Sequence, residues 1–267
     1  MNPEDIAAQF VEARLAGRSI TAYPGGHVPP DLAVAYRVQE AAMSNWPDRS
    51  SGWKIARIGP QWHAQYDEER LIGPVWSRNV HVARPGDVID VPVFQGGLGA
   101  VEAEIGLYVS ADAPANKTDW SVEEAAALVR SMHVGVEMAG SPLATLNDLG
   151  PGAVVSDFGN NWGVIVGAEI PDWRERTDLA AEVFIDHTSV GRASIVVPDV
   201  PLSAFAFALK KTAQRGRPLR AGDYLSTGLI TGVHDIRAGE SSRIDFGSYG
   251  EIRLRAVPAE RYAERSE

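Results

Sequence analysis

The residues best suited to chemistry in this chain are two glutamates that lie two positions apart in an apolar segment. Glu102 and Glu104 interrupt a run, 98–109, that otherwise has the composition of a buried strand. Side chains at positions i and i+2 of a strand point to the same face, so both carboxylates reach one place. A divalent cation with oxygen ligands would stabilise such a pair. Taken alone, however, this spacing is more often that of a half-exposed strand whose glutamates face water.

A third acidic side chain, Glu137, sits in another apolar segment and strengthens the metal interpretation. It is flanked by Val136 and Met138 in a predicted core strand. Burial of an unpaired carboxylate costs several kcal/mol, and neighbouring carboxylates raise one another's pKa. Three carboxylates in two apolar strands therefore favour a site for Mg²⁺ or Mn²⁺, which would keep about three coordination positions for water and substrate. The alternative for Glu137 is a solvated strand end.

Further polar residues are candidates for contact with a substrate. Lys54 lies in the apolar segment 51–58, where a lysine either pairs with an anion or reaches the surface. Beside a metal site it would bind a carboxylate or relay a proton. Thr227 ends an apolar run with hydroxyls and glycines, a pattern that also fits a plain strand-to-turn transition. Asn161 belongs to a polar turn, 155–163, that either lines a pocket or forms an ordinary loop.

These residues must be positioned by a fold that is rich in short strands. Helices are predicted over 4–16, 31–45, 121–131 and 202–214, the third beginning at a capping box formed by Ser121 and Glu124. Strands are predicted over 51–58, 86–93, 98–109, 132–138, 162–168, 180–186, 193–198, 223–230, 241–246 and 250–257. Strands outnumber helices and do not alternate with them, which favours an α+β fold over a Rossmann or βα-barrel arrangement.

Composition excludes several functional classes. The 267 residues carry 25 basic and 35 acidic side chains, a net charge of −10, which argues against a nucleic acid or an anionic membrane as partner. No cysteine is present, so thiolate nucleophiles and cysteine metal sites are excluded. The sequence has no long apolar run and no signal-peptide pattern at its start, so we expect a soluble, cytoplasmic protein.

Taken in order, the segments resemble the 2-keto-4-pentenoate hydratase / 4-oxalocrotonate decarboxylase branch of the fumarylacetoacetate hydrolase superfamily. The resemblance spans nearly the whole chain, and its specificity comes from the order and spacing of short motifs. These motifs are Ala35-Tyr36-Arg37-Val38-Gln39, Gly52-Trp53-Lys54-Ile55, Val101-Glu102-Ala103-Glu104-Ile105-Gly106, Val136-Glu137-Met138, Ser156-Asp157, Leu219-Arg220-Ala221-Gly222-Asp223 and Ser226-Thr227-Gly228.

The resemblance implies a fold, a cofactor and a reaction class. The implied fold is a mixed β-sandwich-like roll of the type found in the superfamily's C-terminal domain. We expect a helical N-terminal portion, 1–80, packed on a β-rich catalytic core, 81–267, as one structural unit. The implied cofactor is Mg²⁺ or Mn²⁺, held by Glu102, Glu104 and Glu137, with Lys54 as the catalytic lysine and Thr227 and Asn161 at the substrate. Family members act on short 2-oxo acids through a metal-chelated enolate, and the family implies a homo-oligomer.

The function predicted from this resemblance is hydration of a 2-hydroxydienoate or 2-oxo-enoate in aromatic-compound catabolism. Decarboxylation of a 2-oxo-enedioate is the first alternative. Hydrolysis of a C–C bond in an acylpyruvate is the second, with His63 and Asp67 as a weak candidate for the base. A metal-free partner subunit is a non-enzymatic alternative.

The sequence also departs from the family pattern. Leu71 stands where family hydratases carry an acid, and Gly140 and Pro142 replace an Asp and an Arg. The candidates to transfer protons in place of the missing acid are Lys54, a metal-bound water, and Glu68 or Glu69 in the nearby loop.

Overall fold

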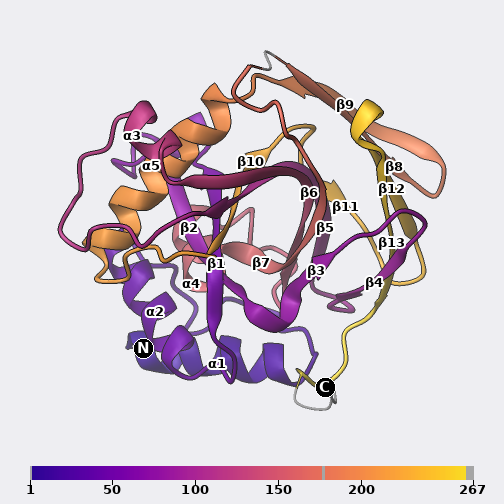
Figure 1. Ribbon diagram of the computed structural model, residues 1–267. Helices are drawn as coiled ribbons and strands as arrows, with labels where there is room; N and C mark the ends of the chain where they lie inside the picture. The colour runs from indigo at the N-terminus through magenta and orange to yellow at the C-terminus, as the bar shows by residue number, and fades with distance from the viewer. Residues whose placement is uncertain (1, 176–177, 263–267) are drawn as a thin grey trace.

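The computed structural model describes residues 2–175 and 178–262. Its strands form two sheets that curl around each other, and its helices lie mainly at one side and one end (Figure 1). The helices are α1 (Pro3–Leu15), α2 (Leu32–Ser44), α3 (Val122–Ala126), α4 (Pro151–Ser156) and α5 (Asp199–Gln214). The strands are β1 (Ser50–Arg57), β2 (Arg70–Trp76), β3 (Val80–Val82), β4 (Val88–Val93), β5 (Leu98–Val109), β6 (Val129–Ser141), β7 (Asn161–Glu169), β8 (Leu179–Ile185), β9 (Thr188–Ile195), β10 (Tyr224–Leu229), β11 (His234–Asp235), β12 (Ser241–Asp245) and β13 (Glu251–Pro258).

The larger sheet carries the acidic residues at its centre. Its strand order is β2-β1-β10-β5-β6-β7-β3, with β11 added beside β5. β5 and β6 are its longest strands and pair antiparallel along almost their full length. β1 joins β10 in parallel, and β3 joins β7 in parallel, so the sheet is mixed. The smaller sheet, β4-β13-β12-β8-β9, forms the opposite wall (Figure 1).

The N-terminal helices anchor the strands that border the site. The amide of Gln39 on α2 donates to the backbone oxygens of Ile72 and Val155, at 3.1 and 2.9 Å. The hydroxyl of Tyr36 accepts a hydrogen bond from the backbone N–H of Ile72 at 3.1 Å. Buried backbone groups need such partners. The Tyr-x-x-Gln spacing thus places both side chains on one face of α2, where they fix β2 and α4.

The segment before residue 81 contributes more than helices. Two of the strands in the larger sheet, β1 and β2, come from it, and they lie in the same hydrogen-bonded network as β5 and β6. The larger sheet thus contains strands from both predicted parts of the chain, 1–80 and 81–267.

Most predicted elements are confirmed, but the helix predicted over 121–131 is wrong in its second half. Its capping box at Ser121 is present, with Ser121 and Glu124 each satisfying the other's backbone N–H. The helix ends at Ala126, and Val129 already begins β6. Val129 and Ser131 pair with Val109 and Tyr108 of β5, so tertiary pairing overrides the local helical preference. The strands β2, β3 and β11 and the helix α4 were not predicted. None of the helices in the described residues is both long and apolar enough to cross a membrane.

Candidate metal centre and adjoining cavities

The three glutamates predicted as metal ligands converge at the centre of the larger sheet. Glu102 on β5 lies directly opposite Glu137 on β6, and Glu104 lies two residues further along β5. All three are buried, with exposures of 3%, 1% and 0% for Glu102, Glu104 and Glu137. One carboxylate oxygen from each lies within 4.8 Å of the others. Two oxygens bound to one Mg²⁺ lie at most about 4.2 Å apart, because each bond is about 2.1 Å. Small side-chain rotations therefore suffice to bring the three oxygens onto one cation.

The electrostatics of this cluster are unfavourable without a cation. Burial, followed by the charge of Glu137, raises the pKa of Glu102 to about 8, although Lys54 acts in the opposite direction. Burial and the charges of Glu137 and Glu102 raise the pKa of Glu104 well above its ordinary value. Like charges in a buried site cannot all be ionised at little cost. A divalent cation would supply the missing positive charge.

Two buried oxygens of the cluster have no hydrogen-bond partner. They are Oε1 of Glu104 and Oε2 of Glu137. The second oxygen of Glu104 accepts a hydrogen bond from the Ser226 hydroxyl, and the second oxygen of Glu137 accepts one from the amide of Asn161 at 3.0 Å. In each of these two carboxylates, a hydrogen bond to one oxygen fixes the orientation, and the other oxygen remains available to a cation. That arrangement fits a hard cation with carboxylate ligands.

Lys54 is the cation that faces the cluster. It lies on β1 with only 2% of its surface exposed, and its Nζ is 3.1 Å from Oε1 of Glu137 and 2.8 Å from Oδ1 of Asn160. Burial lowers the pKa of Lys54, but the charges of the three carboxylates outweigh burial, so its pKa lies above the ordinary value. The carboxylates thus favour the ammonium form of Lys54 in the metal-free site. This form suits the binding of an anion better than the abstraction of a proton.

A strained turn presents Asn160 to Lys54. Phe158, Gly159 and Asn160 all have left-handed backbone angles, with φ of 56°, 66° and 56°. Such angles are rare for residues other than glycine and asparagine, and they often mark functional sites. The turn also packs tightly on β2, because a Cβ at Gly73 would lie 2.0 Å from the backbone oxygen of Phe158. Glycine at 73 thus allows the turn to approach.

The turn is held from behind by Arg14, which is fully buried on α1. Its Nε donates to Oδ1 of Asp157 at 2.5 Å, and its Nη1 donates to the backbone oxygen of Asn161 at 3.1 Å. Its guanidinium also lies over the ring of Phe158, 5.1 Å from the centroid. Arg14 therefore fixes the residues on both sides of the turn. In the sequence, the burial of Arg14 could be inferred from its position four residues after Phe10, which places it on the apolar face of the first helix.

Thr227 and Asn161 occupy different positions relative to the site. Thr227 lines a cavity beside the glutamates, and its hydroxyl donates to the backbone oxygen of Ile105 at 2.7 Å. Asn161 is fully buried, and its amide donates to Glu137. The substrate-binding roles assigned to these two residues stay predictions. The neighbouring Asn160, which had no assigned role, lines a cavity and contacts Lys54.

Two cavities adjoin the cluster and share part of their walls. The first, of about 400 Å³, is walled mainly by apolar side chains of β1, β9, β10 and α5 together with Glu102, Glu104 and Thr227. The second, of about 300 Å³, is lined by Lys54, Asn160, Asn147, Gln61 and Trp62 among others. The residues common to both are Ala56, Arg57, Glu102 and Leu229. Glu102 thus borders both cavities and Glu104 borders the larger one, and each cavity is large enough for a small organic acid.

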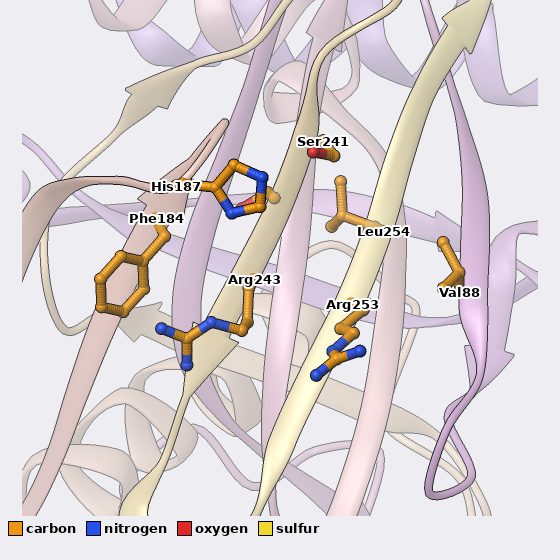
Figure 2. Close-up of a pocket in the computed structure, with 8 residues that line it drawn as sticks. Val88, Phe184, His187, Ser241, Arg243, Arg253 and Leu254 are labelled. Atoms are coloured by element: carbon orange, nitrogen blue, oxygen red, sulfur yellow. The ribbon is translucent and has the colours of Figure 1, made fainter.

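A third cavity, of about 370 Å³, lies on the smaller sheet and shares no lining residue with the other two. Figure 2 shows Phe184, Arg243 and Arg253 on neighbouring strands of that sheet. The guanidinium of Arg243 lies 3.9 Å from the ring centroid of Phe184 and 3.2 Å from a carboxylate oxygen of Asp245. Its positive charge is thus already paired, and no acidic residue lines this cavity.

Among the candidates for the acid or base that the family pattern lacks, Glu68, Glu69 and His63 lie outside the two cavities at the glutamates. Glu68 is bound by Lys211 of α5 at 2.5 Å, and Glu69 is exposed. Nε2 of His63 contacts the backbone oxygen of Ile58 at 2.9 Å, and the ring lines neither cavity. Leu71 does line the smaller one. An apolar side chain therefore occupies the position where family hydratases carry an acid.

Comparison with known proteins relates this geometry to a solved fold. No protein-family model matches the sequence, and no curated protein matches it. Among solved structures, 4-oxalocrotonate decarboxylase from Pseudomonas putida G7, complexed with calcium and acetate or with magnesium and adipate, aligns over 96% of this chain and 97% of its own, with a TM-score of 0.74 and 19% identity. Fumarylpyruvate hydrolase from Pseudomonas aeruginosa, in complex with Mn²⁺ and pyruvate, aligns over 80% of this chain and 91% of its own, with a TM-score of 0.57 and 17% identity.

This chain has the fold of 4-oxalocrotonate decarboxylase. The predicted α+β roll is thus confirmed. A third solved structure with this fold is 2-hydroxyhepta-2,4-diene-1,7-dioate isomerase from Mycobacterium marinum. It aligns over 79% of this chain and 76% of its own, with a TM-score of 0.53 and 15% identity.

Proposed function

We propose that this chain is a divalent-metal-dependent lyase that hydrates a 2-hydroxydienoate or 2-oxo-enoate in aromatic-compound catabolism. The observation that carries the proposal is the cluster of three buried carboxylates beside a buried lysine, open to cavities on two sides. The metal-complexed solved structures that share the fold support it. A cytoplasmic location and a homo-oligomeric state stay predictions.

Glu102, Glu104 and Glu137 would hold the cation. The oxygen-only donor set fits Mg²⁺ or Mn²⁺. When bound, the cation would supply Lewis acidity toward the 2-oxo oxygen, an effect worth several kcal/mol. Ser226 and Asn161 fix the orientation of two of the carboxylates, as the outer hydrogen-bond partners of metal ligands usually do.

Lys54 would bind the carboxylate next to the 2-oxo group. Its ammonium group is held by Asn160 and Glu137 at the edge of the smaller cavity, so its direction is fixed before substrate arrives. A buried, charge-assisted hydrogen bond of this kind orients the substrate and excludes competing water. Thr227, on the wall of the larger cavity, is proposed to contact the substrate from the other side.

Replacement of Lys54 by methionine tests this role. We expect kcat/KM to fall roughly 10- to 100-fold, the value of one charge-assisted hydrogen bond. Mg²⁺ affinity should be kept, because Lys54 contacts Oε1 of Glu137, whereas the oxygen left for a cation is Oε2. Steady-state kinetics and calorimetric Mg²⁺ titration measure the two effects. Loss of Mg²⁺ binding together with activity would mean that Lys54 maintains the site rather than binding substrate.

Metal removal tests the proposed function itself. A spectrophotometric screen of 2-hydroxypentadienoate, 4-oxalocrotonate and an acylpyruvate, with and without Mg²⁺, should show turnover of at least one substrate. Excess EDTA should abolish that turnover, and added Mg²⁺ or Mn²⁺ should restore it. Full activity in EDTA would exclude the metal-dependent mechanism. Absence of both turnover and Mg²⁺ binding would favour a partner subunit without activity.

Decarboxylation of a 2-oxo-enedioate is the second candidate. It is supported by the alignment with 4-oxalocrotonate decarboxylase over almost the whole length of both chains. Both reactions develop negative charge on the 2-oxo oxygen, so the same residues would serve either. Release of CO₂ from 4-oxalocrotonate in the screen distinguishes decarboxylation from hydration. Acylpyruvate hydrolysis is less favoured, because the proposed base, His63, lies outside both cavities.

A further inference from the structure

We propose that Arg57 binds a second carboxylate at the far end of the substrate, which makes the preferred substrate a dicarboxylic 2-oxo acid. This inference rests on the proposed function, because it assumes that the 2-oxo end of the substrate is held at the glutamates. Beyond the proposed function, it assigns a carboxylate to the end of the substrate that lies away from the glutamates.

Arg57 lies where the two cavities meet. It is the last residue of β1, and it lines both cavities together with Ala56, Glu102 and Leu229. Lys54 is three residues earlier on the same strand, a separation of about 10 Å along an extended backbone. Side chains three positions apart on a strand point to opposite faces, yet Lys54 and the exposed Arg57, at the end of β1, both line the smaller cavity. An extended acid with a carboxylate at each end matches that spacing.

Arg57 has no acidic partner of its own. Within the described ranges, 2–175 and 178–262, no carboxylate lies at ion-pair distance from Arg57, and no hydrogen bond from its guanidinium is present. By contrast, Arg243 in the cavity on the smaller sheet pairs with Asp245, and Arg215 beside α2 pairs with Glu40. Arg57 is thus a cation at a cavity wall whose charge the described part of the protein does not neutralise.

A second arginine increases the local positive charge. Arg57 lies directly opposite Arg70 in the pairing of β1 with β2. Burial and then the charge of Arg57 lower the pKa of Arg70, and like charges facing each other across strands are unfavourable. The Arg70 guanidinium donates to the uncharged hydroxyl of Ser203 at 3.4 Å, while the charge of Glu69 acts on its pKa in the opposite direction. An anion at this point would relieve the repulsion.

Arg57 is the one cationic side chain among the residues that line the larger cavity, whose other polar side chains are Ser194, Thr227 and the glutamates. The other walls of this cavity include Ile195, Val196, Val200 and Ile230. These side chains suit the hydrocarbon middle of a substrate. A substrate without a distal carboxylate would leave Arg57 without its anion. Sites built around a polar partner reject analogues that lack it more strongly than apolar pockets reject an extra methylene.

Binding of two matched ligands tests the inference. 2-Oxoadipate and 2-oxohexanoate have the same chain length and the same 2-oxo acid end, and they differ only in the distal carboxylate. In calorimetric titrations with Mg²⁺ present, we expect the wild type to bind 2-oxoadipate roughly 10- to 100-fold more tightly, the value of one charge-assisted hydrogen bond. In Arg57→Met, this preference should disappear through weaker binding of 2-oxoadipate, while 2-oxohexanoate binds as before.

Arg70→Met is the matched control, because it removes an equal charge from the facing residue, which lines neither cavity. We expect it to keep most of the preference. If both variants lost the preference for 2-oxoadipate equally, direct contact by Arg57 would be contradicted. The preference would then come from the combined positive charge of the two arginines. A wild type that binds both ligands equally, or an Arg57→Met variant that keeps its preference, would also overturn the inference while leaving the proposed function standing. If the wild type bound neither ligand in the presence of Mg²⁺, the proposed function and this inference would fail together.

Discussion

Replacement of Glu102 by glutamine is expected to remove activity and yet make the metal-free protein more stable. Activity should fall roughly 10³-fold or more, because a Lewis-acid contribution of several kcal/mol depends on the cation being held. Stabilisation of the fold by Mg²⁺, seen as a rise in Tm with added metal, should be lost or greatly weakened. An amide cannot replace the charge of a carboxylate ligand.

The stability effect has the opposite sign because Glu102 is unfavourable when no cation is bound. Its pKa rises from the ordinary value of 4.5 to about 8 on folding. A carboxyl with a raised folded-state pKa destabilises the fold as the pH rises from the unfolded value to the folded one. Glutamine should therefore stabilise the metal-free protein little below pH 4.5 and by about 3 kcal/mol at pH 7. The gain should level off above pH 8.

Urea unfolding in EDTA across pH 4.5 to 8.5, together with Mg²⁺ titration, measures both effects. Glu169→Gln is a suitable control, because Glu169 is an exposed glutamate at the end of β7 in the same sheet. It should change neither stability nor activity appreciably. If Glu102→Gln destabilised the metal-free protein at pH 7, or retained activity, the assignment of this cluster as a metal site would be wrong.

The second large effect concerns stability and is expected for Arg14→Met. Removal of one partner from a buried ion pair leaves an uncompensated charge, here Asp157, and typically costs about 3 to 5 kcal/mol. Both carboxylate oxygens of Asp157 are hydrogen-bonded, one to Arg14 and the other to Ser141 at 2.6 Å. The variant also loses the hydrogen bond to the backbone of Asn161. We therefore expect Tm to fall by roughly 10 °C, and kcat/KM of the folded fraction to fall because the turn that holds Asn160 is loosened.

Arg18→Met provides the comparison for Arg14→Met. Arg18 pairs with Glu12 at 2.7 Å, but the two side chains are 52% and 70% exposed. Such surface pairs contribute about 0 to 1 kcal/mol, so this variant should unfold close to the wild type. If Arg14→Met cannot be purified, the double variant Arg14→Met/Asp157→Asn should recover part of the lost stability, since it removes both charges. Equal stability of Arg14→Met and Arg18→Met would contradict the assigned role.

The cluster of three glutamates was predictable because its signal is local. The alternation of a strand places Glu102 and Glu104 on one face, and a third glutamate in another apolar segment has the same need for a partner. The early helices, β5 and the capping box at Ser121 were predictable for the same reason, since caps and periodicity depend on a few neighbouring residues. The fold itself followed from the order of several short motifs rather than from any one pattern.

The errors and omissions have physical causes. Residues 129–131 were predicted as helix because local preference continued past the capping box, whereas pairing with β5 decided their conformation. β2 contains Gly73 and Pro74, which weaken its strand signal, yet it pairs with β1 along its whole length. Asn160 was not assigned a role, because the left-handed turn that aims it at Lys54 depends on packing against Gly73.

The sequence by itself determined which residues carry charge into the interior: Glu102, Glu104, Glu137 and Lys54. Only the tertiary structure decided how these charges are arranged, because the register between β5 and β6 sets Glu102 against Glu137, and β1 brings Lys54 to them. It also showed that Arg14 and Asp157, 143 residues apart, form the ion pair behind the site, and that Arg57 stands at the junction of two cavities. Contacts between distant segments depend on how the sheet curls and which strands pair, and no pattern within a short stretch of sequence encodes that choice.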